Sequence, residues 1–160
     1  MGITIRRINK GDNVLLAELI RKVFREFKID KPGTVYKDPT TDSLYELFED
    51  PGSSYWLAEE SGVMLGGCGI YPTSGLPVGC AELVKFYLSA ESRGKGIGKA
   101  LMETSMLWAK EFGYMQLYLE SFPELNKAVS MYEKAGFKTQ LKPLGNSAHY
   151  ACTLWMIKDL

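Results

Sequence analysis

A glycine-rich, basic segment at residues 93–99 constrains the fold of this chain more than any other feature. It reads Arg-Gly-Lys-Gly-Ile-Gly-Lys, follows a run of high β-propensity at residues 81–88, and precedes an amphipathic pattern that stops at Gly113. A strand, a glycine turn and a helix in this order direct several backbone N–H groups and the positive helix end toward one point. The segment therefore predicts an α/β fold whose turn binds phosphate.

The residue types of this turn favour a polyphosphate ligand. Its three glycines allow a ligand to approach the backbone, and its arginine and two lysines add positive charge. Two commoner phosphate motifs do not match. A P-loop needs glycine at position 93 and Ser or Thr at position 100, and the turn lacks the Gly-x-Gly-x-x-Gly spacing of a dinucleotide site. A flexible turn before a basic helix is the alternative interpretation.

The rest of the chain alternates strand and helix patterns. The turn Ser61-Gly62 predicts an antiparallel hairpin, and the glycines at 66, 67 and 69 predict a bulge or a close backbone approach in its second strand. Asp12 is expected to cap the first helix. Strand patterns cover residues 3–8, 55–59, 63–71, 81–88, 115–120, 137–141 and 150–157, and helix patterns cover 16–27, 43–48, 97–112 and 125–132.

Composition limits the class of protein. With 160 residues and 46% hydrophobic content, the chain is expected to form one domain, residues 1–160. Because 19 basic residues balance 19 acidic ones, a non-specific nucleic-acid binder is disfavoured. The chain has no apolar run of the ~20 residues that a membrane helix needs, no secretory leader, and no myristoylation pattern, so we expect a cytoplasmic protein.

Cysteine and histidine usage argues against metal and disulfide chemistry. Cys68, Cys80 and Cys152 are widely spaced, and His149 is the single histidine. We expect no metal site, and we expect the cysteines to be small buried hydrophobes rather than carriers of an acetyl-cysteine intermediate. His149 is expected to be an ordinary surface or hydrogen-bonded residue, with a role at an acceptor site as the alternative. The tryptophans are expected in the core, at positions 56, 108 and 155.

The spacing Arg93-x-x-Gly96-x-Gly98 resembles the acyl-coenzyme A signature Gln/Arg-x-x-Gly-x-Gly/Ala of the GNAT superfamily of N-acetyltransferases. Residues 81–88 look like that family's fourth strand, and residues 128–137 look like its Ala-x-x-x-Tyr-Glu-Lys-x-Gly-Phe helix and strand. The chain departs from the pattern at one place: many members carry asparagine where this chain has Leu125, and Asn126 follows one residue later.

The resemblance implies an α/β (α+β) fold with a mixed, mostly antiparallel sheet of about six to seven strands, splayed strands 4 and 5, and about four helices. It also implies acetyl-coenzyme A as co-substrate. The pantetheine arm would pair with backbone of the fourth strand, and an N–H near Leu88 would polarise the thioester carbonyl. The implied binding residues are Phe86, Tyr87, Leu88, Arg93, Gly94, Lys95, Gly96, Ile97, Gly98, Lys99 and Asn126.

Acetyl transfer to an amine needs a base for the ammonium group and an acid for the leaving thiolate. Tyr132 matches the family's usual acid, with a core tyrosine as the alternative. Glu82 is the candidate base in a direct transfer. The alternative is that Glu82 is an exposed glutamate on a partly solvated strand. A relayed water or Glu120 on the neighbouring strand would serve as base equally well. Tyr87 either lines the cleft or packs behind it.

The acceptor is expected to contact the segments with the least pattern, which are residues 30–42 with the following helix, 72–79 and 142–149. Their mixed charge leaves a small amine, an amino acid, an aminoglycoside or a protein N-terminus open. We expect a small-molecule amine, with no nucleic-acid or membrane partner. An exposed final strand would offer a possible homodimer edge.

Two other functions compete with the enzyme. A catalytically silent coenzyme A sensor would keep the phosphate turn without transferring acyl groups. A nucleotide-binding protein would use the same basic turn and would bind ATP in preference to acetyl-coenzyme A.

Overall fold

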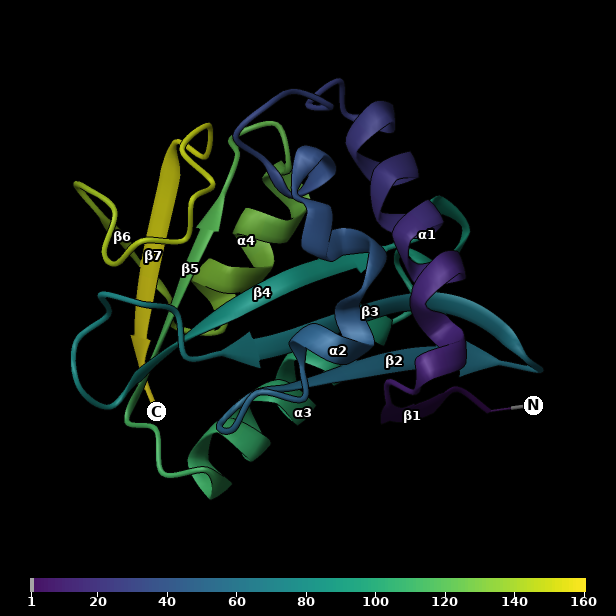
Figure 1. Cartoon of the computed structure of the whole chain (residues 1–160), viewed down its shortest axis with the longest axis horizontal. Helices are drawn as coiled ribbons and strands as arrows, with labels where there is room; N and C mark the ends of the chain where they lie inside the picture. The colour runs from purple at the N-terminus through teal and green to yellow at the C-terminus, as the bar shows by residue number, and fades with distance from the viewer. Residues whose placement is uncertain (1) are drawn as a thin grey trace.

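A computed structural model describes residues 2–160, and over this range the chain forms a seven-stranded sheet in the order β1-β2-β3-β4-β5-β7-β6 (Figure 1). β4 and β5 are parallel, and every other neighbouring pair is antiparallel. The predicted mixed, mostly antiparallel sheet is therefore confirmed. The strands are β1 (Thr4–Arg7), β2 (Ser54–Glu60), β3 (Val63–Tyr71), β4 (Cys80–Leu88), β5 (Gln116–Ser121), β6 (Lys138–Gln140) and β7 (Leu154–Asp159).

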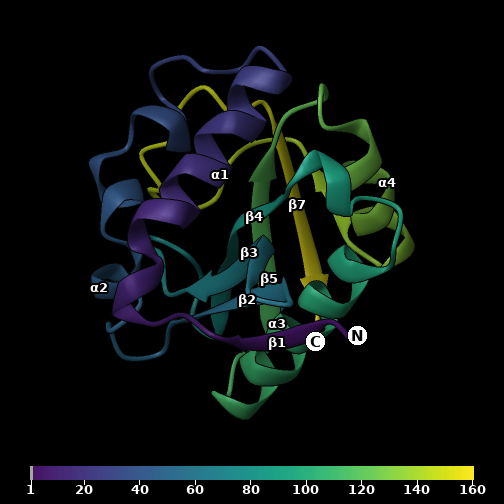
Figure 2. The ribbon, with the colours of Figure 1, turned by 90° about the vertical axis from the view of Figure 1, so that its right-hand side faces the viewer.

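Four α-helices among residues 2–160 cover the two faces of this sheet. Figure 2 shows α1 and α2 on one side of the strands and α4 on the other. None of the helices in residues 2–160 has both the length and the apolar character needed to cross a membrane. The helices are α1 (Asn13–Glu26), α2 (Leu44–Leu47), α3 (Ile97–Glu111) and α4 (Asn126–Lys134).

The alternation of side chains along β2 divides the core into two layers. Tyr55 and Leu57 join the cluster that contains the apolar stripe of α1, whereas Trp56 and Ala58 join the cluster under α3. The α1 stripe is the one that its helical spacing predicts, with Leu16, Ile20 and Phe24 fully buried. Burial of each such side chain contributes about 1.5–3 kcal/mol, so these layers fix the position of the strands between them.

Three sequence expectations differ from the structure. Asp12 makes no capping hydrogen bond to α1, because its carboxylate accepts hydrogen bonds from the Arg6 guanidinium and from the Asn9 backbone N–H. Trp108 is 39% exposed, since it stacks on the outside of the buried Trp56, and Trp155 is only partly buried. The final strand is not an edge: β7 lies between β5 and β6, so an exposed last strand offers no dimer edge.

Candidate active site

The two parallel strands in the middle of the sheet separate soon after they meet. β4 and β5 pair only over residues 80–82 and 116–118, although β4 continues to Leu88 and β5 to Ser121. The backbone edge of β4 at residues 83–88 that faces β5 is therefore left without a partner strand. Such an edge can accept an extended ligand as an additional strand.

A bulge in β4 lies within this separated stretch. Gly69 of β3 pairs with Val84 and Gly67 pairs with Tyr87, so two residues of β4, Lys85 and Phe86, lie opposite one residue of β3. Lys85 has a positive φ of 51°. The glycines of β3 predicted a bulge or a close approach in that strand. The pairing with β2 leaves one extra residue in β3 next to Gly66, and the Tyr55 side chain lies close to Gly67 and Gly69.

Tyr55 holds the bulge in place. Its ring is fully buried against β3, where a side chain at Gly67 would collide with it and a Cβ at Gly69 would come within 2.6 Å of Cδ2. Its hydroxyl donates a hydrogen bond of 2.6 Å to the carbonyl oxygen of Lys85. The bare glycines of β3 thus give room for the tyrosine that satisfies the backbone of the bulge.

The glycine turn connects β4 to α3 and has the backbone geometry of an anion site. Gly94 and Gly96 both have φ of 78°, a conformation that glycine adopts without strain. Gly96 is the N-cap of α3, and no side chain caps the helix there. The first N–H groups of a helix have no partner within the helix. They are therefore available to an anionic ligand, and the helix dipole favours negative charge at this end.

The Arg93 side chain serves α1 as well as the turn. Its guanidinium donates hydrogen bonds of 2.5 and 2.9 Å to the Glu26 carboxylate and one of 3.0 Å to the carbonyl oxygen of Leu88. It also lies over the ring of Phe27, 5.0 Å from the centroid. Because Glu26 balances its charge, Arg93 ties the turn to α1 in addition to facing the ligand side.

A cleft of about 560 Å³ runs between α1, the end of β4, the glycine turn and α4; it is called the wide cleft below. Of the residues predicted to bind acetyl-coenzyme A, all but two line it. Ile97 is buried in the core under α3, and Lys95 is exposed outside the lining. The predicted residues in the lining are Phe86, Tyr87, Leu88, Arg93, Gly94, Gly96, Gly98, Lys99 and Asn126.

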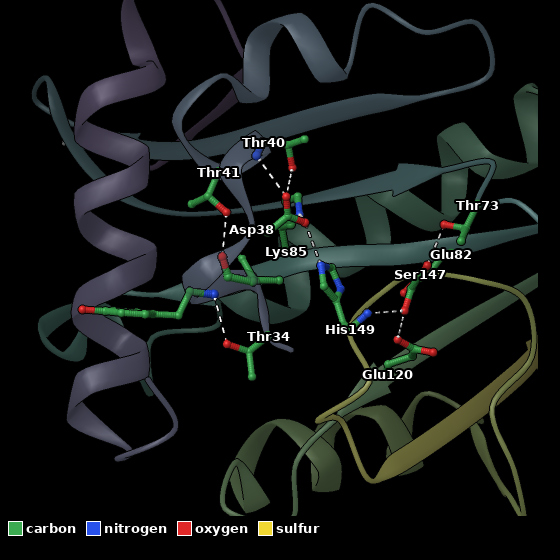
Figure 3. A network of polar contacts seen from close by, with 12 residues as sticks. Thr34, Asp38, Thr40, Thr41, Thr73, Glu82, Lys85, Glu120, Ser147 and His149 are labelled. Atoms are coloured by element: carbon green, nitrogen blue, oxygen red, sulfur yellow. Dashed lines mark hydrogen bonds and ion pairs between the residues drawn. The ribbon is translucent and has the colours of Figure 1, made fainter. Parts of the chain in front are cut away.

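A second cavity of about 40 Å³, the small cavity, borders the same β4 segment. Its lining includes two carboxylates, Glu82 of β4 and Glu120 of β5, together with Lys85 and His149. Figure 3 shows these four side chains in one polar network, with contacts from loops that are far apart in the sequence. The small cavity is therefore lined by several ionisable side chains.

Glu82 is a buried carboxylate with an altered affinity for protons. Only 4% of the residue is exposed, and its Oε1 accepts a hydrogen bond of 2.6 Å from the Thr73 hydroxyl. Burial raises the pKa of Glu82 to about 7; the charge of Glu120 acts in the same direction, while the Thr73 hydrogen bond opposes it. A carboxyl group with a pKa near neutrality is suited to general base catalysis.

Glu120 is held by two hydroxyl groups. The Tyr118 hydroxyl donates a hydrogen bond of 2.7 Å to one carboxylate oxygen, and the Ser147 hydroxyl donates to the other. Both oxygens therefore have a partner, whereas Glu82 has a single hydroxyl donor. This difference favours Glu82 as the proton acceptor of the pair.

Tyr132 lies where the wide cleft and the small cavity meet. It lines both, as do Phe86, Tyr87 and Leu125. The Tyr132 ring packs 6.0 Å from Phe86 and 5.9 Å from Phe137, and burial raises the pKa of its phenol above the usual value. The phenol therefore stays protonated at neutral pH and can act as a proton donor.

Comparison with known proteins assigns this arrangement to a family. The profile of the Acetyltransferase (GNAT) family matches residues 17–137. The chain belongs to the GNAT acetyltransferase family. It is 37% identical to the uncharacterized N-acetyltransferase YjgM of Escherichia coli K12 over 158 residues, which cover 98% of this chain and 94% of YjgM. As a GNAT protein it is an acyl-CoA-dependent acetyltransferase.

Solved GNAT-fold structures agree with the described architecture. An acetyltransferase from Streptococcus agalactiae 2603 superposes with a TM-score of 0.85 at 20% identity, over 100% of this chain and 99% of that one. A phosphinothricin acetyltransferase of the GNAT superfamily from Sinorhizobium meliloti, in complex with AcCoA, gives a TM-score of 0.75 at 21% identity, over 100% and 89% of the two chains. The predicted GNAT fold, with strands 4 and 5 splayed, is confirmed.

The cysteines of this GNAT chain are all buried free thiols. Burial raises the pKa of Cys68 and Cys152 to about 12 and that of Cys80 to about 11. Cys152 lines the small cavity, but a thiol with so high a pKa is a poor nucleophile at neutral pH. Direct transfer is therefore favoured over an acetyl-cysteine intermediate.

The three segments expected to contact the acceptor each contribute a side chain to the polar network of Figure 3. Thr73 donates to Glu82, and Ser147 donates to Glu120. Asp38 Oδ2 lies 2.8 Å from Nε2 of His149, so the single histidine is a hydrogen-bonded residue of the small cavity.

Sequence reasoning missed several residues of this GNAT site. In the wide cleft it missed Val23, Glu26 and Phe27, because nothing in the α1 stripe distinguishes a cleft wall from core. At the small cavity it missed Lys85 and its neighbour Asp38. A lysine between Val84 and Phe86, inside a strand of mostly apolar residues, was the available signal for Lys85.

Proposed function

We propose that this chain transfers the acetyl group of acetyl-CoA directly to the primary amine of a small molecule, with Glu82 as base and Tyr132 as acid. One observation carries the proposal: the wide cleft and the small cavity meet at Tyr132, and the buried carboxylate of Glu82 lines the small cavity. Two substrates bound in these spaces would come together beside both a proton acceptor and a proton donor.

Three features of the wide cleft fit acetyl-CoA as the donor substrate. The open edge of β4 suits the amide groups of a pantetheine arm, the uncapped start of α3 suits a pyrophosphate, and Gly94 and Gly96 leave space above the backbone. When bound, acetyl-CoA supplies an acyl carbon activated by its thioester. The residues proposed to hold it are the nine predicted residues that line the cleft, among them Asn126 at the first turn of α4.

Glu82 is proposed to take the proton from the acceptor amine. An alkylammonium group has a pKa of about 10, so an amine bound at neutral pH arrives protonated and cannot attack. With a pKa of about 7, Glu82 is partly ionised at neutral pH and can accept that proton. The Thr73 hydroxyl orients the carboxylate.

Tyr132 is proposed to protonate the leaving sulfur. Burial raises the pKa of the phenol, so Tyr132 is protonated when the C–S bond begins to break. It would donate its proton to the sulfur as negative charge develops there, and the amine nitrogen, which carries a surplus proton after its attack on the thioester, would return a proton to the phenol. The small cavity supports a small acceptor, because about 40 Å³ leaves room for a polar head group and not for a folded peptide segment.

An amine-panel assay for free thiol release from acetyl-CoA tests the proposal. The wild type should release thiol with at least one amine, and Tyr132→Phe should lower turnover at least about tenfold with nearly unchanged acetyl-CoA affinity. A coenzyme A sensor would bind acetyl-CoA and acetylate nothing. Equal loss of turnover and affinity in Tyr132→Phe would give Tyr132 a packing role instead.

A thermal-shift titration separates the third function. Acetyl-CoA should stabilise the protein at lower concentration than ATP does. A preference for ATP would favour a nucleotide-binding protein and would overturn the proposed reaction.

A further inference from the structure

Lys85 is a buried lysine that the proposed reaction does not use. Its side chain is only 5% exposed, and it projects from the bulge of β4. The neighbours of Lys85 along the strand alternate between the two core layers: Leu83 and Phe86 pack under α3, whereas Val84 and Tyr87 pack on the α1 side. The extra residue of the bulge lets Lys85 leave this alternation and face the small cavity. Burial of an ammonium group costs free energy, so a buried lysine is expected to have an anionic or hydrogen-bonding partner.

The partners of Lys85 within the chain are incomplete. Its nearest anionic atom is Asp38 Oδ2, at 4.0 Å, which is beyond hydrogen-bond distance. Asp38 already accepts hydrogen bonds from the Thr40 N–H and hydroxyl and contacts His149 Nε2. Among residues 2–160 no atom accepts a hydrogen bond from the Lys85 ammonium, although this group has three donors. The ammonium therefore has unused donors at the wall of the cavity.

The charges around the small cavity form two ends. Glu82 and Glu120 supply the acidic end, and the Lys85 ammonium supplies the positive charge at the other end, where His149 and Asp38 also lie (Figure 3). An amine fits beside the carboxylates, where the proposed base lies. An anion fits beside the ammonium of Lys85, where it would take the unused donors and offset the cost of burial.

We infer that Lys85 forms an anion subsite in the small cavity, and that the acceptor is a small amine that also carries a carboxylate, such as a free amino acid. This inference rests on the proposed function, because it names the substrate class of the same site. The bulge presents the lysine, Asp38 keeps its charge partly balanced in the absence of ligand, and His149 closes the same end. Binding of the carboxylate would also counteract the burial that lowers the pKa of Lys85.

The test compares free L-amino acids with their carboxamides. The two members of each pair have the same side chain, but the carboxamide has a neutral amide in place of the carboxylate. The wild type should acetylate the best amino acid with a kcat/KM about thirtyfold or more above that of its carboxamide. Lys85→Met should reduce kcat/KM for the amino acid to within about threefold of the carboxamide. The ratio of the two substrates is the readout, because the Lys85 charge also lowers the pKa of Glu82 and its loss affects both substrates alike. Lys138→Met removes a lysine from exposed β6 and should leave both values unchanged.

A structural role of Lys85 predicts a different pattern. If Lys85 only tied the loop at Asp38 to β4, Lys85→Met would lower kcat/KM for acids and carboxamides by the same factor, and the inference would be wrong. If Lys85→Met does not fold, Lys85→Gln replaces it, since the amide keeps a polar end at the cavity. If the wild-type protein acetylates amino acids and their carboxamides equally well, the inferred anion subsite is wrong, and no variant is needed to show it.

The same reagents separate failure of the subsite from failure of the reaction. If the wild type acetylates neither series, the proposed function fails. The anion subsite is then tested by ligand binding alone. A rise in melting temperature with an amino acid in the presence of coenzyme A, absent with its carboxamide and absent in Lys85→Met, would support the subsite. Equal shifts for acid and carboxamide, or none for either, would overturn it.

Discussion

The wide cleft and the small cavity share one wall, yet they are built from different parts of the chain. The wide cleft, about 560 Å³, includes the open edge of β4, the glycine turn and the uncapped start of α3, so backbone groups are available to a ligand there. The small cavity, about 40 Å³, is lined by the ionisable side chains of Glu82 and Lys85 from β4, Glu120 from β5, and His149, which contacts Asp38. A substitution should therefore act through backbone conformation on one side of Tyr132 and through charge on the other.

The largest effect is expected at the proposed base. Glu82→Gln keeps the shape of the side chain and the acceptor for the Thr73 hydroxyl, but it removes the proton-accepting carboxylate. We expect kcat to fall about 100-fold to 1,000-fold with acetyl-CoA affinity unchanged. Steady-state kinetics and a cofactor titration measure the two quantities. Full activity in this variant would make a relayed water or Glu120 the base.

The pH profile provides the next test on the cavity side. Because the deprotonated form of Glu82 is the active one, kcat/KM should rise about tenfold between pH 6 and pH 8, through its pKa of about 7. Stability should change in the opposite direction. The folded state holds this proton more tightly than the unfolded state, so the free energy of unfolding should fall as pH rises from about 4.5 to about 7. Both pH effects should be absent in Glu82→Gln, and a profile shared by the two proteins would refute the assignment.

On the cleft side, backbone should matter more than charge. Gly96→Val places a β-branched residue at a φ of 78°, which strains the turn, and should raise the Kd for acetyl-CoA several-fold. Lys95→Ala, in the same turn but outside the cleft lining, should change that Kd by less than about twofold. Calorimetric titration of both variants is the measurement. A larger loss in Lys95→Ala would mean that side-chain charge, not backbone, holds the pyrophosphate.

The smallest effect is expected at the ion pair that joins the turn to α1. Arg93→Ala removes the partly exposed pair with Glu26, and we expect a loss of about 1 kcal/mol or less in the free energy of unfolding. Glu26→Ala should cost a similar amount, and the double variant should cost little more than either single one. Urea denaturation of the three proteins measures the coupling between the two side chains.

The wide cleft could be predicted from the sequence because it is local. Residues 86–99 are contiguous, so the strand, the glycines and the start of α3 are visible as one pattern, and α4 follows with its own pattern. The charged side chains of the small cavity are held by Asp38, Thr73 and Ser147, which reach Lys85, Glu82 and Glu120 only when loops of no regular pattern pack. Their contacts depend on tertiary structure and cannot be seen in the local sequence. In addition, the β4 bulge turns the Lys85 side chain away from the face that simple inward–outward alternation along the strand would predict.

The helices show the same difference between local and tertiary signals. The stripe of α1 and the end of α3 near Gly113 were predictable, because apolar spacing and a glycine stop are local signals. The outward position of Trp108 could not be predicted. The Arg7 guanidinium from β1 lies over its ring, 5.3 Å from the centroid, and the spacing of residues within α3 gives no sign of that contact.

The three glycines of β3 have a consequence for how selectivity in this protein can change. A methyl group at position 67 would displace the ring of Tyr55, and the Lys85 carbonyl would lose its hydroxyl donor. Without that anchor β4 could straighten, and the lysine would then rotate toward the apolar layer beneath α3. If Lys85 selects the acceptor as proposed, a mutation at a β3 glycine that contacts neither substrate would change the choice of substrate.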